Sequence, residues 1–145
     1  MAIPTHLKHK PLYGIEDYSK IDCFHRNRSD VEGISLGKAQ WCDSDSFVPS
    51  VKVWRRPNGR WSRQSEETTI TRALDMATLV IKVLDYYHHG ADMGICRSVF
   101  GNLEVEKIGT NKELFDELEK YLEENGEDIQ EHLMLLEEAI KRYEK

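Results

Sequence analysis

The chain has 145 residues, of which 39% are hydrophobic and 32% charged, and its formal net charge is -6. This length supports one compact domain with a real core, and this composition excludes a disordered chain. The acidic total argues against indiscriminate nucleic-acid binding, which needs a positive surface. The charge is uneven, however, because residues 1–64 carry 11 basic and 7 acidic side chains, whereas residues 65–145 carry 9 and 19. This distribution leaves room for a local basic patch in the first half of the chain.

The sequence predicts neither a secretory signal nor a membrane span. Its first residues lack the apolar core of a signal peptide. The longest apolar region, Ala73–Leu84, is too short to cross a bilayer and contains Asp75 and Lys82. The cysteines form no CxxC pair and no disulfide framework, since they lie far apart at Cys23, Cys42 and Cys96. We therefore expect a cytoplasmic protein with reduced thiols.

The first half of the chain predicts an arm followed by a strand. Residues 1–30 are polar and interrupted by prolines and Gly14, which predicts an irregular N-terminal arm with a short helical turn near Glu16–Lys20. Val31–Trp41 is the first predicted strand, although its hydrophobic alternation is weak. Its glycines predict a bulge or a close approach of another backbone segment. Residues 42–50 are predicted to form a loop.

Residues 51–63 predict a β-hairpin. Val51, Val53 and Arg55 alternate with Lys52, Trp54 and Arg56, as in an extended strand. The sequence "PNG" supplies turn chemistry, because proline fixes its φ angle and Asn58 and Gly59 tolerate a positive one. Residues 60–63 are predicted to return as the partner strand.

A long apolar helix is predicted over residues 66–89. Ser65 suits the N-cap position, and Glu66 and Glu67 suit the first turn, where negative charge meets exposed N–H groups. One narrow polar stripe and a mostly apolar remainder predict that this helix is the central element of the fold.

Two amphipathic helices are predicted at the C-terminal end, over Lys112–Glu124 and Glu127–Tyr143, as an antiparallel pair. Their apolar faces need a partner surface, which is either the central helix or a second copy of the chain in a homodimer. The predicted fold class is therefore α+β: a small antiparallel sheet with a β-hairpin, packed on a central helix and a C-terminal helical pair. We expect one domain over residues 1–145.

The segment "GRWSRQSEE", joined to the apolar helix that begins "TTITRALDMATLVI", resembles a small bacterial protein family of unknown function. The resemblance covers about Val51–Tyr87, which is less than a third of the chain. It implies a bacterial cytosolic protein and carries over no activity.

The hairpin and its connection to the helix form the main candidate site. Tryptophans offer flat apolar faces, and arginines offer planar cations that pair with carboxylate or phosphate groups. The candidate binding residues are Trp54, Arg55, Arg56, Arg60, Trp61 and Arg63. In the structural alternative, the tryptophans pack inside the protein and the arginines pair with its own glutamates.

Other chemical candidates carry weaker signals. Cys23 and His25 could form a thiol and base pair, but the sequence shows no zinc motif around them. His88 and His89 suit the negative end of the long helix, and a polar pocket along Asp75, Lys82 and His89 is the alternative role. Asp43 and Asp45 resemble only a fragment of a calcium loop. We predict no cofactor and no metal.

These features together predict a non-catalytic binding module. Its Trp/Arg-rich hairpin would bind an acidic protein or peptide partner. One alternative is a nucleic-acid-associated module that uses the same basic and aromatic surface. A second alternative is an enzyme that uses Cys23 and His25 or the two histidines at the helix end.

Overall fold

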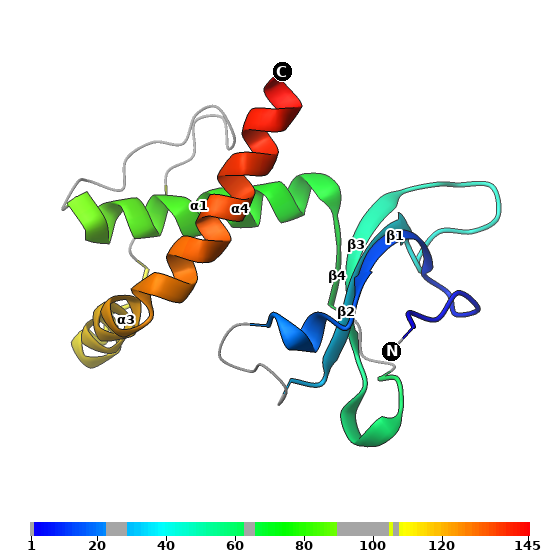
Figure 1. Cartoon of the computed structure of the whole chain (residues 1–145), viewed down its shortest axis with the longest axis horizontal. Coiled ribbons are helices and arrows are strands. Elements are labelled where there is room, and N and C mark those ends of the chain that lie inside the picture. The colour runs from blue at the N-terminus through cyan, green and yellow to red at the C-terminus, as the bar shows by residue number, and fades with distance from the viewer. Residues whose placement is uncertain (1, 23–28, 63–65, 90–104, 106–107) are drawn as a thin grey trace. The chain divides into compact units, whose positions relative to one another are not determined.

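A computed structural model describes residues 2–22, 29–62, 66–89, 105 and 108–145. The chain divides into two compact units, Met1–Ala77 and Thr78–Lys145. The first contains a four-stranded antiparallel sheet, and helices follow it in the chain, so the predicted α+β class is confirmed (Figure 1). The prediction of one domain over residues 1–145 stays a prediction. Helix α1 contains residues of both units.

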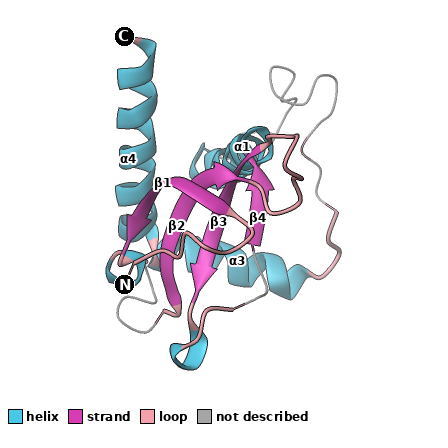
Figure 2. Cartoon of the chain, turned by 90° about the vertical axis from the view of Figure 1, so that its right-hand side faces the viewer, coloured by secondary structure: helices cyan, strands magenta, loops and turns pink. Residues whose placement is uncertain are grey.

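The sheet is a meander in which each strand pairs with its neighbour in sequence. Its strands are β1 (Lys10–Glu16), β2 (Val31–Lys38), β3 (Pro49–Arg55) and β4 (Glu66–Thr69). Figure 2 shows them side by side in this order. β2 confirms the first predicted strand.

Strand β1 corrects the prediction that residues 1–30 form an irregular arm. It pairs antiparallel with β2, from Lys10 opposite Lys38 to Glu16 opposite Gly33, with an irregularity between Pro11 and Tyr13. Pro11 is tolerated because β1 lies at the edge of the sheet, where a missing N–H breaks no ladder. The short turn predicted near Glu16–Lys20 is confirmed as a 3-10 turn at Tyr18–Lys20.

The glycines of the sheet leave room for Ile3, which precedes β1, and for the backbone of β1 at Lys10. A Cβ atom at Gly14 or Gly33 would lie 2.9 or 2.8 Å from Ile3 Cδ1, and one at Gly37 would lie 2.0 Å from the carbonyl oxygen of Lys10. The predicted close backbone approach is therefore confirmed. Ile3 is 9% exposed, so the segment before β1 covers one face of β2, here called the inner face.

The hairpin and the helix start differ from the prediction. β3 pairs with Glu66–Thr69, from Ser50 opposite Thr69 to Val53 opposite Glu66, whereas the described residues of the predicted partner strand, 60–62, are not in a strand. Helix α1 (Ile70–His89) therefore begins four residues later than predicted. Thr69 Oγ1 accepts a hydrogen bond from the Arg72 N–H (3.3 Å), as an N-cap side chain does. Ser65, the predicted cap, lies outside the described residues.

The helical unit contains α3 (Lys112–Glu124) and α4 (Gly126–Glu144), which confirm the two predicted amphipathic helices. Asn125 alone connects them, and Figures 1 and 2 show that they meet at this residue and point in different directions rather than running antiparallel. This corrects the predicted antiparallel pair, because one residue is too short for the usual reversal between helices. No helix in the described part of the chain is long and apolar enough to span a membrane.

Candidate binding surface and the buried network beneath it

The loop between β3 and β4 has a defined turn. Residues Pro57–Gly59 form a 3-10 turn in which Asn58 (φ 54°) and Gly59 (φ 78°) adopt left-handed conformations. The Ser62 N–H closes the base of the loop by donating to the carbonyl oxygen of Arg55 (2.8 Å). We call residues 56–62 the contact loop. Its turn residues behave as the "PNG" sequence predicts, although the strand that follows begins later.

Two of the predicted binding residues are engaged inside the protein. The Trp54 side chain is buried, with 2% of the residue exposed. The Arg55 guanidinium bonds to Asp30 (2.7 Å) and Glu66 (2.5 Å), and the carboxylate of Glu66 is the main cause of its raised pKa. Trp54 is therefore covered, whereas Arg55 stays partly exposed but has its guanidinium paired with two carboxylates of the same chain. Arg63 lies outside the described residues.

The remaining predicted residues meet on the contact loop. The guanidinium carbon of Arg56 lies 5.6 Å from the centre of the Trp61 ring, within the range of a cation–π contact. Arg56 Nε also donates to the carbonyl oxygen of Gly59 (3.0 Å). Arg60 is exposed and Trp61 is partly exposed. The structure thus pairs Arg56 with Trp61 on the contact loop, and exposed Arg60 precedes Trp61 in the chain.

An aromatic column connects the contact loop to the interior. The rings of Trp61 and Trp54 meet edge to face, with centres 5.9 Å apart, and those of Trp54 and His9 meet similarly at 5.8 Å. The Lys52 ammonium lies 4.2 Å from the centre of the Trp54 ring. These contacts fix the orientation of Trp61 from below.

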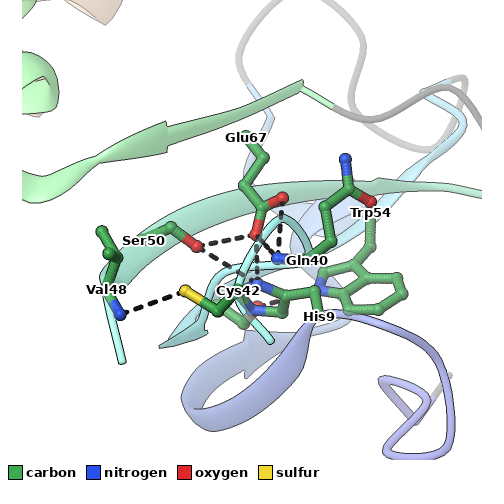
Figure 3. A network of polar contacts seen from close by, with 8 residues as sticks. His9, Gln40, Cys42, Val48, Ser50, Trp54 and Glu67 are labelled. Atoms are coloured by element: carbon green, nitrogen blue, oxygen red, sulfur yellow. Dashed lines mark hydrogen bonds and ion pairs between the residues drawn. The ribbon is translucent and has the colours of Figure 1, made fainter. Parts of the chain in front are cut away.

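The inner end of the column is a buried polar network centred on His9 (Figure 3). His9 is 0% exposed. Its Nδ1 lies 2.6 Å from Glu67 Oε1, and its Nε2 lies 3.1 Å from Ser35 Oγ. Ser35 Oγ also accepts a hydrogen bond from Trp54 Nε1 (2.8 Å).

Glu67 joins the network from β4. Its Oε1 accepts hydrogen bonds from Ser50 Oγ (2.7 Å) and from the backbone N–H of Gln40 (3.2 Å). Lys52 stands opposite Glu67 in the strand register and is 7% exposed. The network therefore joins four segments that are distant in sequence, at His9, at Ser35 and Gln40, at Ser50 and at Glu67. Each buried polar group finds its hydrogen-bond partner in another segment.

Burial sets the charge state of the network. It lowers the pKa of His9 despite the opposing effect of Glu67, and Lys52 lowers it further. Burial also lowers the pKa of Lys52. Neutral His9 then donates from Nδ1 to Glu67 and accepts the Ser35 hydroxyl proton at Nε2, an arrangement that satisfies both ring nitrogens.

The order Ser35–His9–Glu67 is that of a base-activated serine. Ser35 is only 5% exposed, however, and its oxygen already accepts the indole N–H of Trp54. The arrangement therefore suits internal support better than attack on a substrate. Sequence reasoning missed His9 and assigned Glu67 to a helix start. The one available signal was polar Ser50 and Lys52 on the same strand face as Trp54.

Two of the other predicted chemical residues, Cys23 and His25, lie outside the described residues. His89 Nδ1 pairs with Asp85 Oδ1 (2.8 Å) near the end of α1. In the described part of the chain, no group of three or more His, Cys, Asp or Glu residues is arranged to hold a metal ion.

The helical unit contains a cavity of about 530 Å³ between α1, α3 and α4. His88 and His89 line it together with Asp85, whereas Asp75 and Lys82 do not. The predicted polar pocket therefore includes His89 but not its two other residues.

The predicted calcium-loop fragment forms a local turn, in which the Asp43 side chain accepts a hydrogen bond from the backbone N–H of Asp45 (3.0 Å).

The model of DUF6530, a family of unknown function, matches residues 1–145, so the protein belongs to this family. The resemblance noted for residues 51–87 is therefore part of a match that covers the whole chain. No curated protein and no solved structure matches the chain.

Proposed function

We propose that this DUF6530 protein is a non-catalytic binding module whose contact loop binds an acidic protein or peptide. The observation that carries the proposal is the Arg56–Trp61 pair beside exposed Arg60, on a loop closed by the Ser62–Arg55 hydrogen bond. Guanidinium groups pair with carboxylates, and an aromatic ring supplies apolar contact area with few internal rotations.

Preorganisation strengthens this proposal. Binding usually costs conformational entropy when loops and long side chains become ordered. Here the loop is ordered before binding, because Trp61 rests on buried Trp54 and Arg56 is bonded to the carbonyl oxygen of Gly59. More of the contact energy therefore remains available as affinity.

Fluorescence anisotropy with a labelled Glu/Gly-alternating dodecapeptide tests the proposal, with a Lys/Gly peptide as the charge control. Trp61→Ala should weaken binding of the acidic peptide at least tenfold, as expected for a central aromatic contact. Arg60→Ala should weaken it about threefold to tenfold. Arg142→Ala, which removes an exposed arginine from α4, is the matched control and should leave affinity unchanged. Equal binding by wild type and Trp61→Ala would contradict the proposal.

A labelled dT20 oligonucleotide separates the nucleic-acid alternative. That alternative predicts tighter binding of the oligonucleotide than of the peptide, and an affinity that falls steeply with salt. The net charge of -6 repels both anionic probes at long range, and salt screens this repulsion, so both probes are compared at the same ionic strength.

A further inference from the structure

Residues 2–9 form a segment that we call the strap. Ile3, Pro4 and His9 are its buried residues, whereas Thr5, His6 and Lys8 are exposed. Ile3 occupies the space above Gly14 and Gly33, and His9 enters the polar network. The strap is therefore anchored at its two ends, and its middle makes little buried contact.

The strap covers a polar surface. Beside the buried Trp54, the inner face of the sheet carries Ser35, Ser50, Lys52 and Glu67, where a buried face is ordinarily apolar throughout. Burial of these groups is tolerated because they bond to one another and to His9. Release of His9 would therefore let water solvate these polar groups, which offsets part of the cost of exposing the Trp54 ring.

The hydrogen bonds at Ser35 favour neutral His9. The Ser35 oxygen accepts the indole N–H of Trp54, and its own proton points to His9 Nε2. When His9 gains a proton, Nε2 becomes a second donor toward the same oxygen. The Ser35 proton then loses its acceptor inside the protein, and a buried donor without a partner is destabilising.

The charged groups around His9 divide in their effect. Glu67 from β4 favours the protonated ring, whereas Lys52 from β3 opposes it, and the remaining neighbours, Ser35, Ser50 and Trp54, are neutral. Burial is the largest influence and lowers the pKa of His9 below its ordinary 6.5. Solvation of the released strap removes this influence, so acid favours release.

We propose that the strap is an acid-opened cover: protonation of His9 releases residues 2–9 and uncovers the polar inner face of the sheet. The released ring binds its proton near pH 6.5, and the buried ring binds it only at lower pH. Between these values each unit of acidification increases the open fraction by up to about tenfold. This opening does not depend on what the contact loop binds.

Indole hydrogen exchange in the intact protein measures the opening directly. The Trp54 N–H is protected by Ser35 beneath the strap, whereas Trp41 is 51% exposed and serves as an internal reference for the chemical exchange rate. The ratio of the Trp54 rate to the Trp41 rate should rise by up to about tenfold from pH 7.5 to 5.5. In His9→Gln, which cannot titrate, the ratio should stay constant.

The wild-type experiment alone can overturn the proposal, even if His9→Gln does not fold. A constant Trp54/Trp41 ratio would show that acid does not lift the strap. An equal rise in exchange of the β3 backbone amides would show that the whole sheet unfolds instead. A rise confined to the Trp54 indole supports the proposal.

Discussion

Replacement of Glu67 by alanine should destabilise the sheet unit far more than replacement of its neighbour Glu66. Glu67 Oε1 accepts hydrogen bonds from the His9 ring, the Ser50 hydroxyl and the Gln40 N–H, and its side chain is 2% exposed. Each buried donor left without an acceptor costs about 1–3 kcal/mol. Lys52 also loses the nearest opposing charge in its strand register.

The expected loss for Glu67→Ala is about 3–5 kcal/mol in the free energy of unfolding, allowing for rotation of the Ser50 hydroxyl toward other acceptors. Glu66 is the matched control, since it precedes Glu67 in β4 but is 56% exposed and pairs with Arg55 at the surface. Loss of such a surface pair costs about 0–1 kcal/mol.

Urea unfolding followed by tryptophan fluorescence measures the difference. Every tryptophan lies in the sheet unit, at Trp41, Trp54 and Trp61, so the signal reports on that unit. The midpoint of Glu67→Ala should fall by about 2 M relative to wild type, given typical urea slopes of about 1–3 kcal/mol per M. A midpoint no lower than that of Glu66→Ala would refute the account of the network.

Further predictions concern pH, the glycines and a helix cap. The pKa of His9 is lower in the folded protein than its ordinary 6.5, so the unfolded chain binds a proton first as the pH falls. The contribution of His9 to the free energy of unfolding is therefore fully present above pH 6.5 and should decrease below it, by up to about 1.4 kcal/mol per pH unit. Urea titrations at pH 7.5 and 5.5 measure this decrease, which His9→Gln should remove. Gly37→Ala should prevent β1 from pairing with β2, because the new Cβ would lie 2.0 Å from the Lys10 carbonyl oxygen, and should lower the midpoint of thermal unfolding by many degrees. Gly126→Ala is the control, since its Cβ would meet no atom within 4 Å, and should not lower this midpoint. Asn111→Ala should cost about 1 kcal/mol, seen as earlier loss of helical circular dichroism, because its side chain caps α3.

The elements predicted well are those defined by local sequence. The bounds Lys112–Glu124 follow from a helical apolar period that begins after a capping Asn111 and ends at a polar break. The turn at Asn58 and Gly59 likewise depends on the conformational freedom of those two residues alone.

The elements missed are those defined by distant partners. β1 contains Pro11 and Gly14 and has poor strand propensity, yet it pairs along β2. Glu66–Glu67 satisfies the rules for a helix start, but Glu67 gains more from buried His9, Ser50 and Gln40 than from exposed N–H groups. Local propensity cannot reveal a partner 58 residues away.

The candidate site was predicted in composition but not in exposure. The sequence placed tryptophans and arginines together on one hairpin, and the fold pairs Arg56 with Trp61 on the contact loop, where Arg60 is exposed. Which indole is buried depends on what lies over the sheet. Trp54 is covered because Ser35 and His9 meet it there, and neither is near it in sequence.

The most direct measurement of the binding proposal is an NMR titration of the 15N-labelled protein with the Glu/Gly peptide. The account predicts that the Trp61 indole N–H and the Arg56 and Arg60 amides shift progressively, while the Trp54 indole and the amides of α4 do not. Shifts confined to the helical unit, with the contact loop unchanged, would contradict it.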